Sequence, residues 1–218
     1  MPYRKRIQAE LEAARRRTDY AVIRGIVDGG SRVLDLGCGA GQLLTLLRAD
    51  KNVLGYGVEL SGDRIIECVE KGLSVFQGDI DEGLRDFEDQ SFDYVILNQT
   101  LPVTHKPPYV VDEMLRVGRR GIISFPNFAH WKIRWQLMAG GRMPVSESIP
   151  HEWYDTPNIH HLSIKDFYLF CRRFEVTVLH SYFFSALENG TVHERRQAHT
   201  HSPFWLHAAP SLLALFRY

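Results

Sequence analysis

The spacing of apolar and polar positions varies along the chain, so that predicted strands alternate with predicted helices. Short apolar runs bounded by glycine, asparagine or charged residues predict buried strands, and apolar residues three and four positions apart predict helices. Strands are predicted at 33–36, 53–58, 75–78, 92–97, 121–125, 174–179 and 212–216. This alternation predicts an open α/β domain whose seven-stranded, mostly parallel sheet carries helices on both faces.

Helix boundaries are marked by local signals between these strands. The run after residue 41 places Leu43, Leu44, Leu46 and Leu47 toward a core. Other predicted boundaries are Ser61 as an N-cap, Lys71-Gly72 as a helix end, Pro107-Pro108 as a helix start, and a capping box from Ser163 to Asp166. Between Ser61 and Lys71, Ile65, Ile66 and Val69 form an apolar stripe.

The alternating pattern fails in two places. Residues 127–158 combine several tryptophans and histidines with a glycine pair and three single prolines, and loops of this length are usually functional or disordered. We interpret 127–162 as an aromatic-rich lid or interface insertion. The polar stretch 188–202 is predicted to be an exposed loop. The whole chain, 1–218, is expected to be one domain that begins with a helical segment over 1–30.

Composition excludes several classes of protein. The chain of 218 residues carries 26 Lys plus Arg and 26 Asp plus Glu, so a general attraction for nucleic acid or anionic membrane is not expected. The basic residues among the first 17 are interpreted as a solvated helix face. No apolar run reaches the ~20 residues of a membrane span. Cys38, Cys68 and Cys171 lack metal or redox spacing, and a reducing cytoplasm fits this odd number best.

The most informative segment is the glycine loop at residues 37–41, which follows a predicted strand and opens a predicted helix. Gly37, Gly39 and Gly41 stand at every second position, so the backbone there can take positive φ and approach a ligand closely. The following helix start offers unpaired N–H groups at the same spot. The spacing D-x-G-x-G-x-G has Gln42 where the dinucleotide fingerprint needs its third glycine, which disfavours NAD.

Acidic residues at successive strand ends favour S-adenosylmethionine, or its demethylated product S-adenosylhomocysteine, as the ligand. Asp35 could meet its cationic groups, Glu59 could accept both ribose hydroxyls, and Asp79 with Ile80 could contact the adenine. Ligands of open α/β sheets bind at the carboxyl ends of the strands, where Asn98 and Asn127 also fall. The candidate cofactor residues are Asp35, Gly37, Cys38, Gly39, Gly41, Glu59, Leu60, Asp79, Ile80 and Asn98.

Longer motifs give the chain a more specific resemblance, which runs from about residue 31 to 174. The chain resembles the MetW family of methionine-biosynthesis proteins, which has the Rossmann-like class I methyltransferase fold. The matching motifs lie at 31–41 (SRVLDLGCGAG), 55–59, 77–83 (QGDIDEG), 91–97, 99–101, 114–119, 124–128, 130–131, 141–144 and 153–159. Asn98 stands where a serine is usual, and His160-His161 stand where one histidine is expected.

The resemblance implies a role beside homoserine O-acetyltransferase, as a supporting or regulatory partner that binds S-adenosylmethionine. The alternative is an active small-molecule methyltransferase. If a base is needed for methyl transfer, the candidates are His130, His151, Tyr154 and His160, each of which could equally be structural. A homo-oligomer stays open. His160-His161 and His199-Thr-His201 lack the spacing of a closed metal site, and no basic-aromatic groove for nucleic acid is evident.

Overall fold

The computed structural model describes residues 2–146, 149–184, 192–196 and 210–217. These residues form two compact units. Unit 1 comprises residues 1–98 and 108–122, and unit 2 comprises residues 99–107 and 123–218. No helix among the described residues has both the length and the apolar character needed to cross a bilayer.

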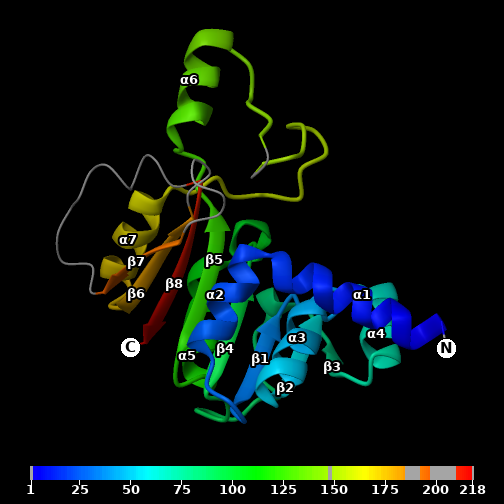
Figure 1. Ribbon diagram of the computed structural model, residues 1–218. Helices are drawn as coiled ribbons and strands as arrows, with labels where there is room; N and C mark the ends of the chain where they lie inside the picture. Colours follow the sequence, from blue (N-terminus) through cyan, green and yellow to red (C-terminus); the bar gives the residue numbers. More distant parts are fainter. Residues whose placement is uncertain (1, 147–148, 185–191, 197–209, 218) are drawn as a thin grey trace. The chain divides into compact units, whose positions relative to one another are not determined.

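Unit 1 is built on a parallel sheet with the strand order β3-β2-β1-β4 (Figure 1). Its strands are β1 (Arg32–Leu36), β2 (Leu54–Glu59), β3 (Ser74–Gln77) and β4 (Tyr94–Asn98). In the middle of this sheet Asp35 is level with Gly57 on one side and Ile96 on the other. Beside β4 the chain begins β5 (Gly121–Pro126), where the Val95 N–H donates to the Arg120 carbonyl at 2.9 Å.

The order of these strands creates a reversal between β1 and β4. From β1 the chain moves outward to β2 and β3 through α3 (Gln42–Lys51) and α4 (Gly62–Glu70). From β4 it moves the opposite way to β5 through α5 (Pro107–Val117). Because crossovers between parallel strands are right-handed, the two directions place their helices on opposite faces. A ligand crevice is expected at the carboxyl ends of β1 and β4, where the direction reverses.

The leucines predicted to face the core from α3 are buried: Leu43, Leu44, Leu46 and Leu47 are at most 2% exposed. In α4 the buried residue is Cys68, whereas Ile66 and Val69 of the predicted apolar stripe are 60% and 61% exposed. The predicted helix ends are confirmed, with Ser61 at the N-cap of α4, Lys71 at its C-cap and Gly72 at φ +67°. The helix α4 therefore turns its one cysteine, and not its aliphatic stripe, inward.

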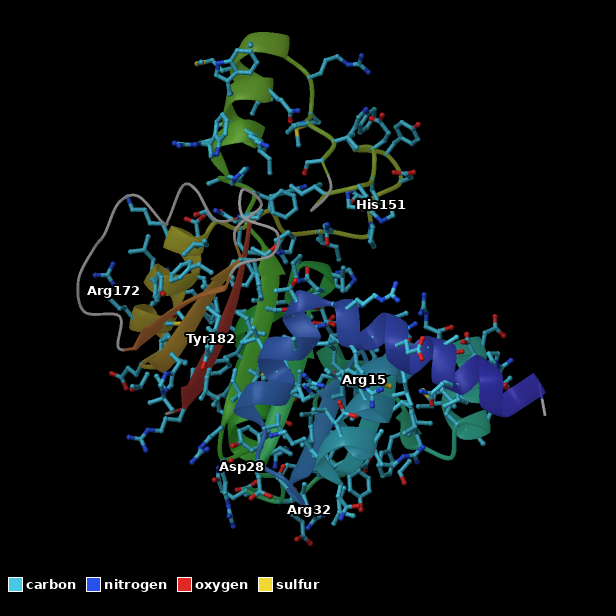
Figure 2. All side chains as sticks on the ribbon, viewed as in Figure 1. Arg15, Asp28, Arg32, His151, Arg172 and Tyr182 are labelled. Carbon is cyan, nitrogen blue, oxygen red and sulfur yellow. The ribbon has the colours of Figure 1, made fainter. Side chains whose placement is uncertain are left out.

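Two N-terminal helices, α1 (Pro2–Arg16) and α2 (Thr18–Ile26), contact α3 within unit 1. Arg15, on α1 in Figure 2, lies 2.6 Å from the Asp50 carboxylate at the end of α3. Arg24 of α2 reaches the other oxygen of the same carboxylate, also at 2.6 Å. The hydrogen bonds from both guanidinium groups lower the pKa of Asp50. Part of the basic N-terminal face is therefore used to join helices, where the sequence suggested only a solvated surface.

Unit 2 continues β5 and contributes the strand order β5-β8-β6-β7. β6 pairs antiparallel with both of its neighbours, β7 and β8. The elements of this unit are α6 (Trp131–Gly140), α7 (Ile164–Arg173), β6 (Thr177–Phe184), β7 (Val192–Arg196) and β8 (Ser211–Arg217). Short 3₁₀ turns stand at Leu101–Val103 in this unit and at Ile80–Glu82 in unit 1. The predicted capping box at Ser163 and Asp166 is present at the start of α7.

The α/β class and the mostly parallel sheet are confirmed, and each of the seven predicted strands is present. One strand boundary and one predicted loop were wrong. β6 begins at Thr177 and not at 174, because α7 ends on Phe174 and Glu175 takes a left-handed φ of +57°. The predicted loop at 188–202 contains the strand β7, which pairs with β6. The rest of that loop, including His199 and His201, lies outside the described residues.

Candidate functional site

The glycine loop leaves β1 and crosses to the end of β2 within unit 1. Gly37, Gly39 and Gly41 have φ values of +69°, +56° and +70°, which are left-handed and favour glycine. The N–H groups of Gly37 and Cys38 both donate to the Val58 carbonyl, at 2.8 and 3.1 Å. These two bonds hold the first half of the loop against β2.

Two glycines at this site have neighbours too close for an added Cβ, and one of them, Gly41, also has a left-handed φ. A Cβ on Gly41 would collide with Leu73 Cδ1 and lie 3.0 Å from Cys68 Sγ. A Cβ on Gly57, in the neighbouring strand β2, would lie 2.5 Å from Cys38 Sγ. The loop is therefore packed against its own neighbours, and larger residues at these two positions would displace it.

The Glu59 carboxylate ties the glycine loop to the end of β2. One oxygen, Oε2, accepts the Gly39 N–H at 2.8 Å. The other oxygen, Oε1, accepts the N–H groups of Leu60 and Ser61, both at 3.0 Å. A carboxylate has about four acceptor positions, so Oε2 keeps capacity for a ligand hydroxyl. The Leu60 side chain beside it is 64% exposed.

Asp35 is a buried acid, with 3% of its surface exposed. Burial raises its pKa to about 8, and the nearby Cys68 and Glu59 add to the increase. The positive charge of Arg17 acts in the opposite direction on the same pKa. A carboxyl group in this state is poised to ionise when a cation comes next to it, because an adjacent positive charge favours the charged form.

Arg17, which the sequence analysis did not single out, belongs to the same region. Its guanidinium group lies 3.8 Å from the centre of the Tyr20 ring and 2.6 Å from Asp19. Asp19 also accepts a hydrogen bond from Asn98 at 3.1 Å, at the carboxyl end of β4. The junction between α1 and α2 thus reaches the carboxyl end of β4, where the reversal of strand order predicts a crevice. The run of arginines before Asp19 gave no periodic signal that distinguished Arg17 from its neighbours.

Asp79 and Ile80 follow β3, as predicted, and both are half-buried. Asp79 caps the 3₁₀ turn that begins at Ile80, since its Oδ1 accepts the Asp81 N–H at 2.9 Å. The preceding Gly78 N–H donates to the Glu59 carbonyl at 3.1 Å. The ends of β2 and β3 are therefore joined, and Asp79 lies beside the strand that carries Glu59.

Lys71, which the sequence predicted only as a helix end, also contacts the glycine loop. Its side chain is 3% exposed, and its Nζ lies 2.9 Å from Glu10 of α1 and 2.8 Å from the Ala40 carbonyl. A lysine at a helix end is usually solvated, so only the folded arrangement reveals this position. Lys71 connects α1 and α4 with the glycine loop.

The four candidate bases all belong to unit 2. His130 is 6% exposed and caps α6, with its ring centroid 5.9 Å from that of Trp131. His151, labelled in Figure 2, and His160 are exposed. Tyr154 is 71% exposed and makes an edge contact with Trp153. Asn127, also in unit 2, is buried and accepts the Ala129 N–H at 3.1 Å, which indicates a structural role.

Comparison with known proteins assigns the chain to a family. Residues 17–207 match the family described as "Methionine biosynthesis protein MetW". The chain belongs to the MetW family. A relative in Rhodopirellula baltica, the "Bifunctional methionine biosynthesis protein MetXA/MetW", is 40% identical over 157 residues. That match covers 68% of this chain but only 25% of the relative, so the MetW chain spans about a quarter of that protein.

Solved structures support the fold of this MetW chain. An S-adenosylmethionine-dependent methyltransferase from Mesorhizobium loti aligns with a TM-score of 0.66 and 16% identity, covering 93% of this chain and 98% of that one. A chain from the complex between the Trm112 methyltransferase activator and a methyltransferase of Haloferax volcanii aligns with a TM-score of 0.65 and 19% identity, covering 98% and 93%. At these identities the likeness establishes the Rossmann-like methyltransferase fold alone.

Among the described residues of this MetW chain, no three His, Cys, Asp or Glu side chains are grouped as metal ligands would be. The groups that do converge are the glycine loop, Asp35, Glu59, Asp79 and the Arg17 cluster, all in unit 1. This set offers acidic acceptors and close backbone, which suits a ligand with positive charge and hydroxyl groups.

Proposed function

We propose that this chain binds S-adenosylmethionine at the glycine loop and supports or regulates homoserine O-acetyltransferase in methionine biosynthesis. The observation that carries the partner half is the R. baltica relative, whose name joins MetXA and MetW in one protein. Two functions fused in one chain in one organism are a natural pair of partners in another. Sensing S-adenosylmethionine would let a product of methionine control the step that activates homoserine.

The chemistry of unit 1 supports this ligand. S-adenosylmethionine carries a sulfonium and an ammonium but no phosphate, and the acids at 35, 59 and 79 match such a ligand better than a pyrophosphate. We assign the ammonium to Asp35, whose buried carboxyl would gain a counter-charge. We assign the ribose hydroxyls to Glu59, whose Oε2 has acceptor capacity, and the adenine to Asp79 and Ile80.

The partner surface that we propose is α6, in unit 2. Within this helix only Ile133 is buried, whereas Trp131, Trp135 and Met138 are 43%, 60% and 78% exposed. Large aromatic and methionine side chains are enriched in protein interfaces, and a helix exposed on nearly all sides gains most from a partner. The stretch 127–145 carries lysine and arginine but no acidic residue, so an acidic rim on the partner would fit it.

A pull-down tests both halves. The full chain and the homoserine O-acetyltransferase of the same organism are mixed with and without S-adenosylmethionine. Light scattering then measures the molar mass of any complex that is recovered. We expect a complex whose affinity changes with the cofactor, because two linked sites share one coupling free energy. No complex under either condition would contradict the partner half, while calorimetry with the cofactor alone would still test binding.

Variants locate the surface. The double variant Trp135→Ala with Met138→Ala is expected to weaken the complex at least about tenfold, the loss typical of one interface hot spot. Leu169→Ala is the matched control, since Leu169 is an apolar residue of the same unit that is 45% exposed on α7. Equal weakening by both variants would contradict α6 as the specific surface.

An active methyltransferase is the second candidate, favoured by a glycine loop and strand-end acids that suit the methyl donor. Transfer from a sulfonium needs orientation and a dry site more than it needs a base. Labelled methyl transfer to a panel of small nucleophiles tests this activity. If transfer occurs, single replacement of His130, His151, Tyr154 and His160 tests each as the base, and unchanged rates would exclude them.

A further inference from the structure

Two of the three cysteines come together under the glycine loop of unit 1. Cys38 lies inside the loop and Cys68 lies on the inner side of α4, with 9% and 0% of their surfaces exposed. Both thiols point at one acceptor, the Gly39 carbonyl oxygen, with Cys68 Sγ at 3.2 Å and Cys38 Sγ at 3.7 Å. The single S–H of Cys38 can also turn from this carbonyl to donate to the Cys68 sulfur. The sulfur atoms are therefore neighbours although 30 positions of sequence separate them.

Two glycines leave room for the sulfur atoms of this pair. The missing Cβ of Gly57 leaves room for Cys38 Sγ on the β2 side, since a Cβ there would lie only 2.5 Å from the sulfur. The missing Cβ of Gly41 does the same for Cys68 Sγ, at 3.0 Å. The space that each sulfur occupies therefore depends on a neighbouring glycine.

The surroundings make one sulfur of the pair easier to ionise. The hydrogen bond from Cys38 lowers the pKa of Cys68, and the positive charge of Lys71 acts in the same direction. The same hydrogen bond, with burial, raises the pKa of Cys38. A thiolate is the reactive form of cysteine, and a neighbouring thiol that stabilises it is the usual arrangement of redox-active pairs.

We propose that Cys38 and Cys68 form a redox-modification site, at which a small hydroperoxide converts the two thiols into a disulfide. The thiolate sulfur attacks one peroxide oxygen, the O–O bond breaks, and the departing oxygen takes the thiol proton. The second thiol then attacks the resulting sulfenic sulfur, an S–S bond forms, the S–O bond breaks, and water leaves with the second proton. One hydroperoxide is reduced by two electrons, and two thiols are oxidised.

The disulfide changes the cofactor site, and this step rests on the proposed S-adenosylmethionine function. A disulfide has no S–H group, so the Gly39 carbonyl loses both of its thiol donors. The N–H of the same residue is held by Glu59, which makes Gly39 the point where the thiol pair and the ribose acceptor meet. Oxidation therefore disturbs the loop that contacts the ligand. By reciprocity, bound ligand makes the pair harder to oxidise.

Peptide mapping of the full chain tests the site directly. The reduced protein is treated with hydrogen peroxide, free thiols are blocked with iodoacetamide, and the digest is read by mass spectrometry without reduction. We expect a peptide that joins Cys38 to Cys68 and that dithiothreitol separates. Cys171→Ala is the matched control, because Cys171 is also buried, in unit 2, and should not change the cross-link. Cys38→Ser and Cys68→Ser should each abolish it.

Calorimetry then measures S-adenosylmethionine affinity for the reduced, oxidised and re-reduced chain. We expect oxidation to weaken binding at least about tenfold, the order of the loss when a half-buried carbonyl is left without its hydrogen-bond donors, and reduction to restore it. Three free thiols after treatment, irreversible over-oxidation without a cross-link, or a cross-link to Cys171 would overturn the site. Unchanged affinity of the cross-linked chain would overturn the effect on the ligand. A reduced chain that binds no ligand would instead refute the proposed function, while the peptide map still decides the disulfide.

Discussion

Lys71 and Glu10 form an ion pair of 2.9 Å whose lysine side chain is only 3% exposed. The same Nζ donates to the Ala40 carbonyl at 2.8 Å, so one ammonium group joins α1 to the glycine loop. Lys71→Met keeps the length of the side chain but removes the charge and its donors. We expect the variant to lose about 1–3 kcal/mol of unfolding free energy, because two part-buried acceptors, the Glu10 carboxylate and the Ala40 carbonyl, are left without their charged donor.

Urea denaturation measures this loss for Lys71→Met. Lys165→Met is the control, since Lys165 is exposed on α7 and should change stability by less than about 0.5 kcal/mol. The N-terminal helix should also become easier to cleave in limited proteolysis of the Lys71 variant. Equal stability of the two variants would show that the ammonium group does not hold α1 in place.

Gly41 offers a test of the loop geometry. Its φ of +70° and the collision of an added Cβ with Leu73 predict that Gly41→Ala is strained in two ways. We expect a loss of about 2–4 kcal/mol in unfolding free energy, combining left-handed strain with overpacking. Gly62→Ala is the matched control, because a Cβ on Gly62, the first residue of α4, meets nothing within 4 Å.

Thermal unfolding compares the stability of the Gly41→Ala and Gly62→Ala variants. Gly62→Ala should be neutral or up to about 1 kcal/mol more stable, since alanine is the better helix former. A Gly41→Ala variant as stable as the natural chain would mean that Leu73 and the loop give way easily. In that case the close packing described here would not constrain the ligand site.

Features with a local cause were predictable from the sequence, and features made by distant residues were not. The capping box at Ser163 and the buried leucines of α3 follow from neighbours within one helix, so periodicity and capping rules were enough. Cys68, Lys71 and Arg17 acquire their roles only when the crossovers bring α1, α4 and the glycine loop together. No pattern within a short window carries that information.

In the aromatic segment, the usual burial preference of a residue type gave the wrong expectation. Tryptophans and methionines usually predict burial, yet Trp135 and Met138 are 60% and 78% exposed. Their exposure is consistent with the interface interpretation of 127–162, which rested on the aromatic content of the segment and not on periodicity. The strand β7 was missed for a related reason, because the polar sequence 192–196 forms a strand by pairing with β6 and not by its own propensity.

Asp35 predicts how stability depends on pH. Its pKa is raised to about 8 in the folded chain, mainly by burial, whereas an aspartate in an unfolded chain has a pKa near 3.9. Between these values the folded state holds a proton that the unfolded state has lost. Its contribution to stability is therefore complete at low pH and decreases as the pH rises from about 4 to about 8.

Asp35→Asn removes this titration while keeping a similar shape. We expect the free energy of unfolding of the variant to fall less steeply between pH 5 and 8 than that of the natural chain, by up to about 1.4 kcal/mol per pH unit. Denaturation in a series of buffers measures both slopes. Parallel curves would indicate that Asp35 is already ionised in the folded chain.

Ligand binding should expel the same proton. A carboxyl with a pKa of about 8 is mostly neutral at pH 6.5, and the ammonium of S-adenosylmethionine beside it would favour the charged form. We expect close to one proton to be released per ligand bound at this pH. Isothermal titration in phosphate and in Tris, which have different ionisation enthalpies, gives that number from the difference in measured heat.

The release should be lost in Asp35→Asn, whereas Asp63→Asn, at an exposed position in the first turn of α4, should keep it. Binding without proton release in the natural chain would separate Asp35 from the ammonium and move the cation to another acid of the site.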